Sequence, residues 1–155
     1  MKTPPNAIMV RRYRAGLSRI VGRMMLLLTT TGRKSGNPHT VCVQYELMEG
    51  KYYIGAGFGE KCDWYKNLKV DPHVTVEVGK HKFNGTAEVL DGEEKIADFI
   101  AYRLKKSPLM VGLILKMDGC SFRPSRAELL EYSRRIGVAV VTPNPYENAS
   151  ENSIV

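Results

Sequence analysis

Alternating apolar and polar positions predict β-strands through much of the chain. Period-2 alternation is typical of a strand that buries one face and exposes the other. The dipeptides Glu49-Gly50 and Gly79-Lys80 predict two hairpin turns, because such residues suit the tight turns between paired strands. The predicted strands lie over residues 24–30, 39–48, 51–57, 74–78, 81–90 and 138–141.

Apolar residues spaced three and four apart predict helices at both ends of the chain and one between the hairpins. The N-terminal helix has Tyr13 on its apolar face and Asn6 as its expected N-cap. Asp63 is the expected N-cap of the short helix, and Ser125 with Glu128 forms a capping-box pattern. The predicted helices lie over residues 6–22, 63–70, 93–106 and 125–136.

Consecutive hairpins followed by one returning strand predict a small antiparallel barrel with helices on its outside. We divide the chain into a basic amphipathic helix over 1–22, a barrel domain over 23–143 and a polar tail over 144–155, which we expect to be disordered. The apolar runs over 24–28 and 109–115 are far shorter than the roughly 20 residues that cross a bilayer. We therefore expect a cytoplasmic protein.

Positive charge is concentrated near the N-terminus. The chain has 23 Lys and Arg against 16 Asp and Glu, but residues 1–45 hold eight basic residues and no acid. Such a segment attracts anions. The helix over 1–22 either packs on the domain through its apolar face or lies on an anionic membrane surface. We expect no nucleic-acid partner, because Tyr13 alone interleaves an aromatic ring with these basic residues.

The loop over 32–36 is the best candidate for an anion site. Arg33, Lys34 and Ser35 offer a guanidinium, an ammonium and a hydroxyl, and the flanking glycines offer backbone N–H groups. These are the groups that bind a phosphate. The alternative is an ordinary solvated turn. No metal site is expected, because His39 and Cys42 lie three apart in a predicted strand and so face opposite sides.

Trp64 and Asn67 form a second candidate. They lie one helical turn apart, so the indole and the amide point to the same side of the predicted short helix. An aromatic plane beside an amide suits a flat heterocycle. The alternative is that Trp64 anchors the core under the loop.

The loop and the short helix together resemble a known family. The string LLLTTTGRKSG over 26–36, followed by DWYKNL over 63–68 and Asp71-Pro72, is similar to the deazaflavin-dependent nitroreductases. The resemblance implies a split antiparallel β-barrel with flanking helices, a mostly β fold of the α+β class. It also implies a hydride transfer from reduced coenzyme F-420 to a flat, electron-poor small molecule, such as a quinone, an enone or a nitroaromatic, and a homodimer.

The resemblance assigns coenzyme-binding roles to residues of this chain. Arg33, Lys34 and Ser35 would hold the phosphate and the acidic tail of the coenzyme. The residues expected to surround the deazaflavin ring are Cys42, Val43, Gln44, Gly57, Phe58, Asp63, Trp64 and Asn67.

This chain departs from the family pattern at three positions. His39 stands where an arginine is usual, Cys42 where a proline is frequent, and Phe58 near the place of a lysine that Lys61 would replace. These departures leave FMN as an alternative cofactor. A non-catalytic protein that binds anions or a membrane surface through its basic N-terminus is a further alternative. No catalytic residue is assigned.

Overall fold

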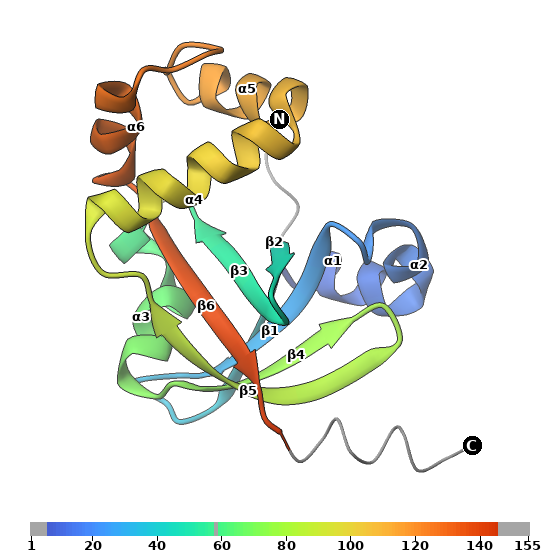
Figure 1. Cartoon of the computed structure of the whole chain (residues 1–155). Helices are drawn as coiled ribbons and strands as arrows, with labels where there is room; N and C mark the ends of the chain where they lie inside the picture. The colour runs from blue at the N-terminus through green and yellow to red at the C-terminus, as the bar shows by residue number, and fades with distance from the viewer. Residues whose placement is uncertain (1–5, 58, 146–155) are drawn as a thin grey trace.

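A computed structural model describes residues 6–57 and 59–145 and confirms the antiparallel barrel (Figure 1). Six strands close in the order β1-β2-β3-β6-β5-β4, and every neighbouring pair is antiparallel. The strands are β1 (Met25–Thr31), β2 (Pro38–Met48), β3 (Lys51–Ala56), β4 (His73–Val78), β5 (His81–Val89) and β6 (Gly137–Pro143). Phe58 and the tail beyond residue 145 lie outside the described residues.

Both predicted hairpins are present. Glu49 and Gly50 both have positive φ angles, 52° and 76°, which is the backbone of a type I′ turn between β2 and β3. Gly79, with φ of 60°, turns the chain from β4 to β5. In β2, the side chains of Val41, Val43 and Tyr45 pack against the barrel core, as their alternation predicts.

The helices form two groups outside the barrel, and α3 (Asp63–Val70) with η2 (Gly59–Lys61) lies apart from both. The N-terminal group is α1 (Asn6–Arg12), η1 (Tyr13–Leu17) and α2 (Ser18–Val21), and the other group is α4 (Glu93–Lys106), α5 (Pro108–Met117) and α6 (Arg126–Ser133). Figure 1 shows α4, α5 and α6 together beyond one end of β3 and β6, with α1 and α2 apart from them beside β1, β2 and β4. Helix α5 was not predicted, because apolar residues on all its sides leave no period to recognise.

Five details of the predicted helices are wrong. Gly16, with φ of 133°, breaks the single helix expected over 6–22. Asn6 was expected as the N-cap but lies within α1, and its side-chain amide donates to Thr40 O at 2.7 Å. Cys62 holds the N-cap position expected for Asp63, whose carboxylate pairs with an arginine. Helix α6 ends at Ser133. Ser125 is its N-cap, as predicted, and its Oγ accepts from the Glu128 N–H at 3.3 Å, but the Glu128 carboxylate accepts from Ser121 and so does not complete the capping box.

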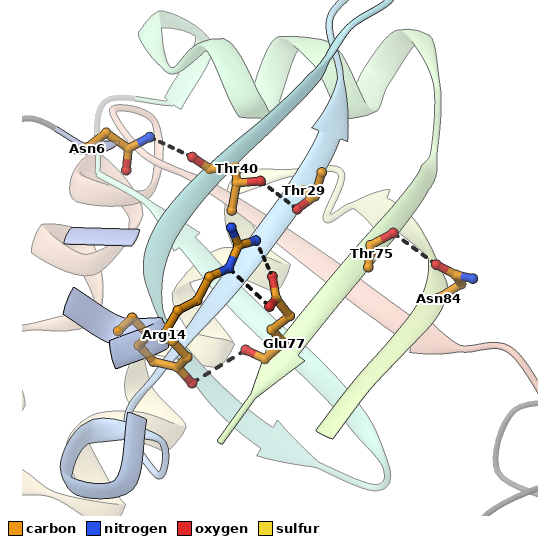
Figure 2. A network of polar contacts seen from close by, with 8 residues as sticks. Asn6, Arg14, Thr29, Thr40, Thr75, Glu77 and Asn84 are labelled. Atoms are coloured by element: carbon orange, nitrogen blue, oxygen red, sulfur yellow. Dashed lines mark hydrogen bonds and ion pairs between the residues drawn. The ribbon is translucent and has the colours of Figure 1, made fainter. Parts of the chain in front are cut away.

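The N-terminal helices pack on the barrel through one buried tyrosine. Tyr13 is 1% exposed, its hydroxyl donates to Met25 O at 3.0 Å, and it accepts from the Gly79 N–H at 3.0 Å. Arg14 forms an ion pair with Glu77 of β4 at 2.8 Å (Figure 2). The apolar face of this segment was expected either to pack on the domain or to lie on a membrane. Tyr13, which belongs to this face, packs on the barrel.

A buried polar joint ties the loop between β1 and β2 to α3. Asn67 is 3% exposed, and its Oδ1 accepts from the Arg33 N–H at 3.2 Å and from Arg33 Nη1 at 2.9 Å. Its Nδ2 donates to Thr30 Oγ1 at 3.2 Å. Arg33 Nη2 also pairs with Asp63 Oδ1 at 3.1 Å. These contacts fix where the loop lies relative to the helix.

Two hydrophobic clusters stabilise the fold. The first fills the barrel and includes Trp64, Tyr65 and Leu68 of α3, so this helix closes one part of the barrel interior. The second lies between the barrel wall and helices α4–α6; its buried members are Ile96, Ala97, Phe99, Ile100, Val111, Leu115, Leu129, Tyr132 and Val138. The barrel wall thus has apolar packing on both sides where α4–α6 cover it.

We expect Tyr13→Phe to lower the free energy of unfolding by about 1–3 kcal/mol, because it leaves the Gly79 N–H without its acceptor. Ile20→Ala, on the exposed side of the same segment, should change it by less than about 0.5 kcal/mol. Urea denaturation followed by circular dichroism measures both. Equal losses in the two variants would contradict the packing role of Tyr13.

We expect Asn67→Leu to cost about 2–3 kcal/mol of unfolding free energy, because the part-buried Arg33 N–H and the buried Thr30 hydroxyl both lose their partner. Lys34→Ala, in the same loop region, is the control and should stay within about 0.5 kcal/mol, since its side chain is exposed. The same denaturation experiment compares them. A loss below 0.5 kcal/mol in Asn67→Leu would show that the joint is not structural.

Candidate functional site

A cleft of about 520 Å³ lies where the β1–β2 loop meets α3 and the start of α1. Its lining is Asn6, Gly32, Arg33, Lys34, Ser35, His39, Thr40, Val41, Asp63, Trp64 and Asn67. The predicted site residues among them are Arg33, Lys34, Ser35, His39, Asp63, Trp64 and Asn67. The fold therefore brings the loop and the short helix, about 30 residues apart in sequence, to one site.

Lys34 is the cation of this cleft that is free to meet a ligand. The Arg33 guanidinium is engaged by Asp63 and Asn67, so its charge is largely neutralised within the protein. The Lys34 side chain is exposed and forms no ion pair with any described residue. Although the two residues are adjacent in sequence, Arg33 holds the site together and Lys34 faces solvent.

The loop uses both of its glycine N–H groups internally, contrary to the expectation that they point to a ligand. Gly32 N–H donates to Asn37 O, and Gly36 N–H donates to Gly32 O, both at 2.8 Å. Ser35 Oγ accepts from the Asn37 N–H at 3.1 Å. A Cβ on Gly32 would lie 2.6 Å from Ser35 Oγ and 2.8 Å from the His39 ring. A side chain at position 32 would therefore displace the Ser35 hydroxyl and the His39 ring from their present positions.

Trp64 belongs to both the core and the cleft. Its side chain is 8% exposed, it is a member of the barrel cluster, and its ring meets that of Tyr65 edge-on at 5.8 Å between centroids. The two interpretations of this residue are therefore compatible, because the core packing fixes the indole as a rigid wall of the cleft.

The other predicted ring-binding residues do not line this cleft. Val43 packs against the barrel core, and Cys42 is half-buried, where burial raises the pKa of its thiol above the usual value. Gln44 and Gly57 line a second cavity, and Lys61 lines an open cleft that adjoins it. Phe58 is outside the described residues.

The second cavity, of about 180 Å³, lies between the barrel wall and helices α4–α6. Its lining is Gln44, Gly55, Ala56, Gly57, Phe99, Ile100, Arg103, Val111, Ile114, Leu115, Asp118, Tyr132, Ile136 and Val138. It adjoins a cleft of about 600 Å³ with which it shares Gly57, Asp118, Tyr132 and Ile136. A mainly apolar lining with a few placed polar groups is usual for a small-molecule site.

Besides Asp118, two polar side chains in this cavity were not predicted. The Tyr132 hydroxyl donates to Asp118 Oδ2 at 2.7 Å; burial, and then this hydrogen bond, raise the pKa of the phenol above its usual value. Arg103 lies with its guanidinium 5.9 Å from the Phe99 ring centre and its Nε 3.8 Å from Glu46 Oε2. Local sequence patterns cannot mark either residue, because their placement depends on how α4 and α6 pack on the barrel.

Metal sites and membrane-spanning helices are both absent from residues 6–57 and 59–145. No group of three or more His, Cys, Asp or Glu side chains is placed to hold a metal ion there. Within the same residues, no helix has both the length and the apolar content needed to cross a membrane.

Solved structures support the fold and its relation to deazaflavin enzymes. An F420-H2 dependent reductase is 29% identical, with a TM-score of 0.51, and the match covers 77% of this chain and 94% of that one. A second structure, described as a domain-swapped dimer, is 26% identical with a TM-score of 0.54 and coverage of 90% and 99%.

Sequence comparison identifies the family. An F420H(2)-dependent quinone reductase of Mycobacterium tuberculosis is 39% identical over 66 residues, which are 41% of this chain and 44% of that protein. The chain thus spans less than half the length of the curated relatives it matches. The sequence model of one family matches residues 6–109, a range that contains the loop, α3 and every residue lining the first cleft. By this match, the chain belongs to the F420H(2)-dependent quinone reductase family.

Proposed function

We propose that this protein transfers a hydride from reduced coenzyme F-420 to a flat, electron-poor acceptor, with quinones as the first class to test. The observation that carries the proposal is the first cleft. The exposed Lys34, which has no ion pair with any described residue, and the buried Trp64 both line it. The family match covers all residues that line this cleft. The name of the family and the names of its relatives support F-420 rather than FMN as the cofactor.

The residues of the first cleft suit the chemistry of this coenzyme. A polyanion with a flat ring needs a cation, hydrogen-bond donors and an apolar plane. Lys34 and the Ser35 hydroxyl meet the first two needs, and Trp64 meets the third. We assign the anionic part of the coenzyme to Lys34 and Ser35, with Arg33 supporting the loop through its bonds to α3.

The second cavity is the candidate for the acceptor. Gln44 and Gly57 line it, and Thr40 and Val41 on the same strand β2 line the first cleft, so one rigid strand connects the two sites. Its apolar walls suit a flat acceptor with few polar atoms. The residues Cys42, Val43, Phe58 and Lys61 stay predictions as ligand contacts.

Chemistry in this site is divided between the coenzyme and the protein. When bound, the deazaflavin supplies the hydride. The protein binds, orients and shields the reactants, and these effects lower the barrier by fixing geometry and excluding water. Tyr132 holds a proton on its hydroxyl at the wall of the second cavity, directed to Asp118.

Partners other than the small molecules stay predictions. A homodimer is supported by the relative described as a domain-swapped dimer. A membrane contact through residues 1–22 is supported by the exposed Arg11, Arg12 and Arg19, although Tyr13 of the apolar face is buried in the fold. A cytoplasmic location is likewise a prediction.

We expect the purified protein to accelerate the oxidation of reduced F-420 by a soluble benzoquinone. The measurement follows the return of oxidised F-420 absorbance, with reduced FMN as the parallel donor. Acceleration with F-420 but not with FMN supports the proposal. Activity with FMN alone would favour the FMN alternative. No acceleration with either donor, for any acceptor in a panel of quinones, enones and nitroaromatics, would contradict an oxidoreductase function.

We expect Lys34→Ala to raise the KM for reduced F-420 about 10–100-fold, because a hydrogen bond to a charged group contributes about 1.5–3 kcal/mol. Lys80→Ala is the control, since it removes the same charge from the β4–β5 turn, away from the cleft. Steady-state kinetics at low salt compare the two. Equal KM values would contradict the role of Lys34.

A further inference from the structure

Helix α5 is apolar on its buried side and on its exposed side. Val111, Gly112 and Leu115 face the cluster between the helices and the barrel. The exposed residues of α5 are Leu109 (76%), Met110 (40%), Leu113 (55%) and Met117 (79%). Leu109, Leu113 and Met117 recur every four residues, so they form one stripe along the helix. We call these four side chains the α5 stripe.

Basic residues flank the α5 stripe at both of its ends. Lys105 and Lys106 precede α5, and Lys116 lies in its last turn. No acidic residue occurs over 99–117, a range that holds four basic residues, whereas the rest of the chain after residue 45 has 11 basic and 16 acidic residues. Lys106 pairs with Glu46, but Lys105 and Lys116 form no ion pair with described residues.

We propose that α5 docks this protein on the surface of an anionic lipid bilayer. The α5 stripe enters the boundary between headgroups and acyl chains, while Lys105 and Lys116 reach the lipid phosphates. Long lysine side chains commonly extend in this way from an apolar helix to a polar headgroup layer. With ten residues, α5 is about 15 Å long and cannot cross a hydrocarbon core of about 30 Å, so it lies along the surface.

A lipid surface fits these observations better than a second copy of the chain. In a two-fold dimer the same patch meets itself, so the lysines of α5 would be brought against one another. A stable dimer also needs roughly 20–30 residues on each side, and the α5 stripe has four. An anionic bilayer instead neutralises the lysines and takes up the apolar side chains together.

Docking through α5 would bring lipid close to the second cavity. Val111, Ile114 and Leu115, on the other side of the same helix, line that cavity. An apolar acceptor dissolved in the bilayer would then have a short path to it. This consequence rests on the proposed function, whereas the docking itself does not.

Sedimentation of the full-length protein with phosphatidylcholine vesicles, with and without phosphatidylglycerol, tests the proposal. We expect binding to the anionic vesicles, weakened at least about tenfold by Leu113→Ser with Met117→Ser, because both substitutions remove apolar surface that the bilayer would bury. Lys105→Glu with Lys116→Glu should abolish the preference for anionic vesicles. Ile20→Ser is the matched control, because Ile20 is as exposed as Met117 but lies in the N-terminal helices.

Three results would overturn the proposal. Wild-type protein that does not sediment with anionic vesicles excludes docking, and loss of binding in Ile20→Ser alone assigns it to the N-terminal helices. The wild-type protein could instead bind no vesicles but self-associate in light scattering. If Leu113→Ser with Met117→Ser removes that self-association, the α5 stripe contacts a second copy of the chain. Affinity for F-420, measured in solution on the same variants, keeps a failure of docking separate from a failure of the proposed function.

Discussion

The side-chain amide of Asn67 is the contact on which the first cleft depends. Buried amide groups need all their partners, because an unsatisfied one costs about as much as a whole hydrogen bond contributes. Asn67 meets this need by accepting from the backbone and guanidinium of Arg33 and donating to Thr30. The joint fixes α3 against the loop, and with it Trp64 one turn earlier. It also explains why two adjacent basic residues differ, since Arg33 is committed to the joint and Lys34 is left for a ligand.

The barrel carries the two candidate binding regions on one rigid frame. Strand β2 passes through the first cleft at Thr40 and Val41 and reaches the second cavity at Gln44. Its register with β1 includes Thr40, Val41 and Gln44 and fixes them relative to one another. A site built on strands holds reactants more accurately than one built on loops, which matters where orientation provides most of the rate. The helices α4–α6 complete the arrangement by covering the second cavity.

Local patterns predicted the strands, the hairpins and most helix positions, because period and turn chemistry are properties of neighbouring residues. They also placed Lys34, Ser35 and Trp64 in one candidate site through the family resemblance. What they missed depends on distant contacts. Asp63 is not an N-cap because Arg33 engages its carboxylate, and the Gly32 N–H is not free because the loop closes on Asn37. The second cavity, with Tyr132 and Arg103, arises only when α4–α6 pack on the barrel, so no local pattern marks it.

The most direct test of the central claim is a fluorescence titration of the purified protein with oxidised F-420 and, separately, with FMN. Trp64 is the sole tryptophan, and it lines the first cleft, so its emission reports on that cleft without a label. The account predicts saturable quenching by F-420 at concentrations well below those needed for FMN. Tight F-420 binding by calorimetry with no change in Trp64 emission, or a preference for FMN, would contradict the assignment of this cleft to the deazaflavin coenzyme.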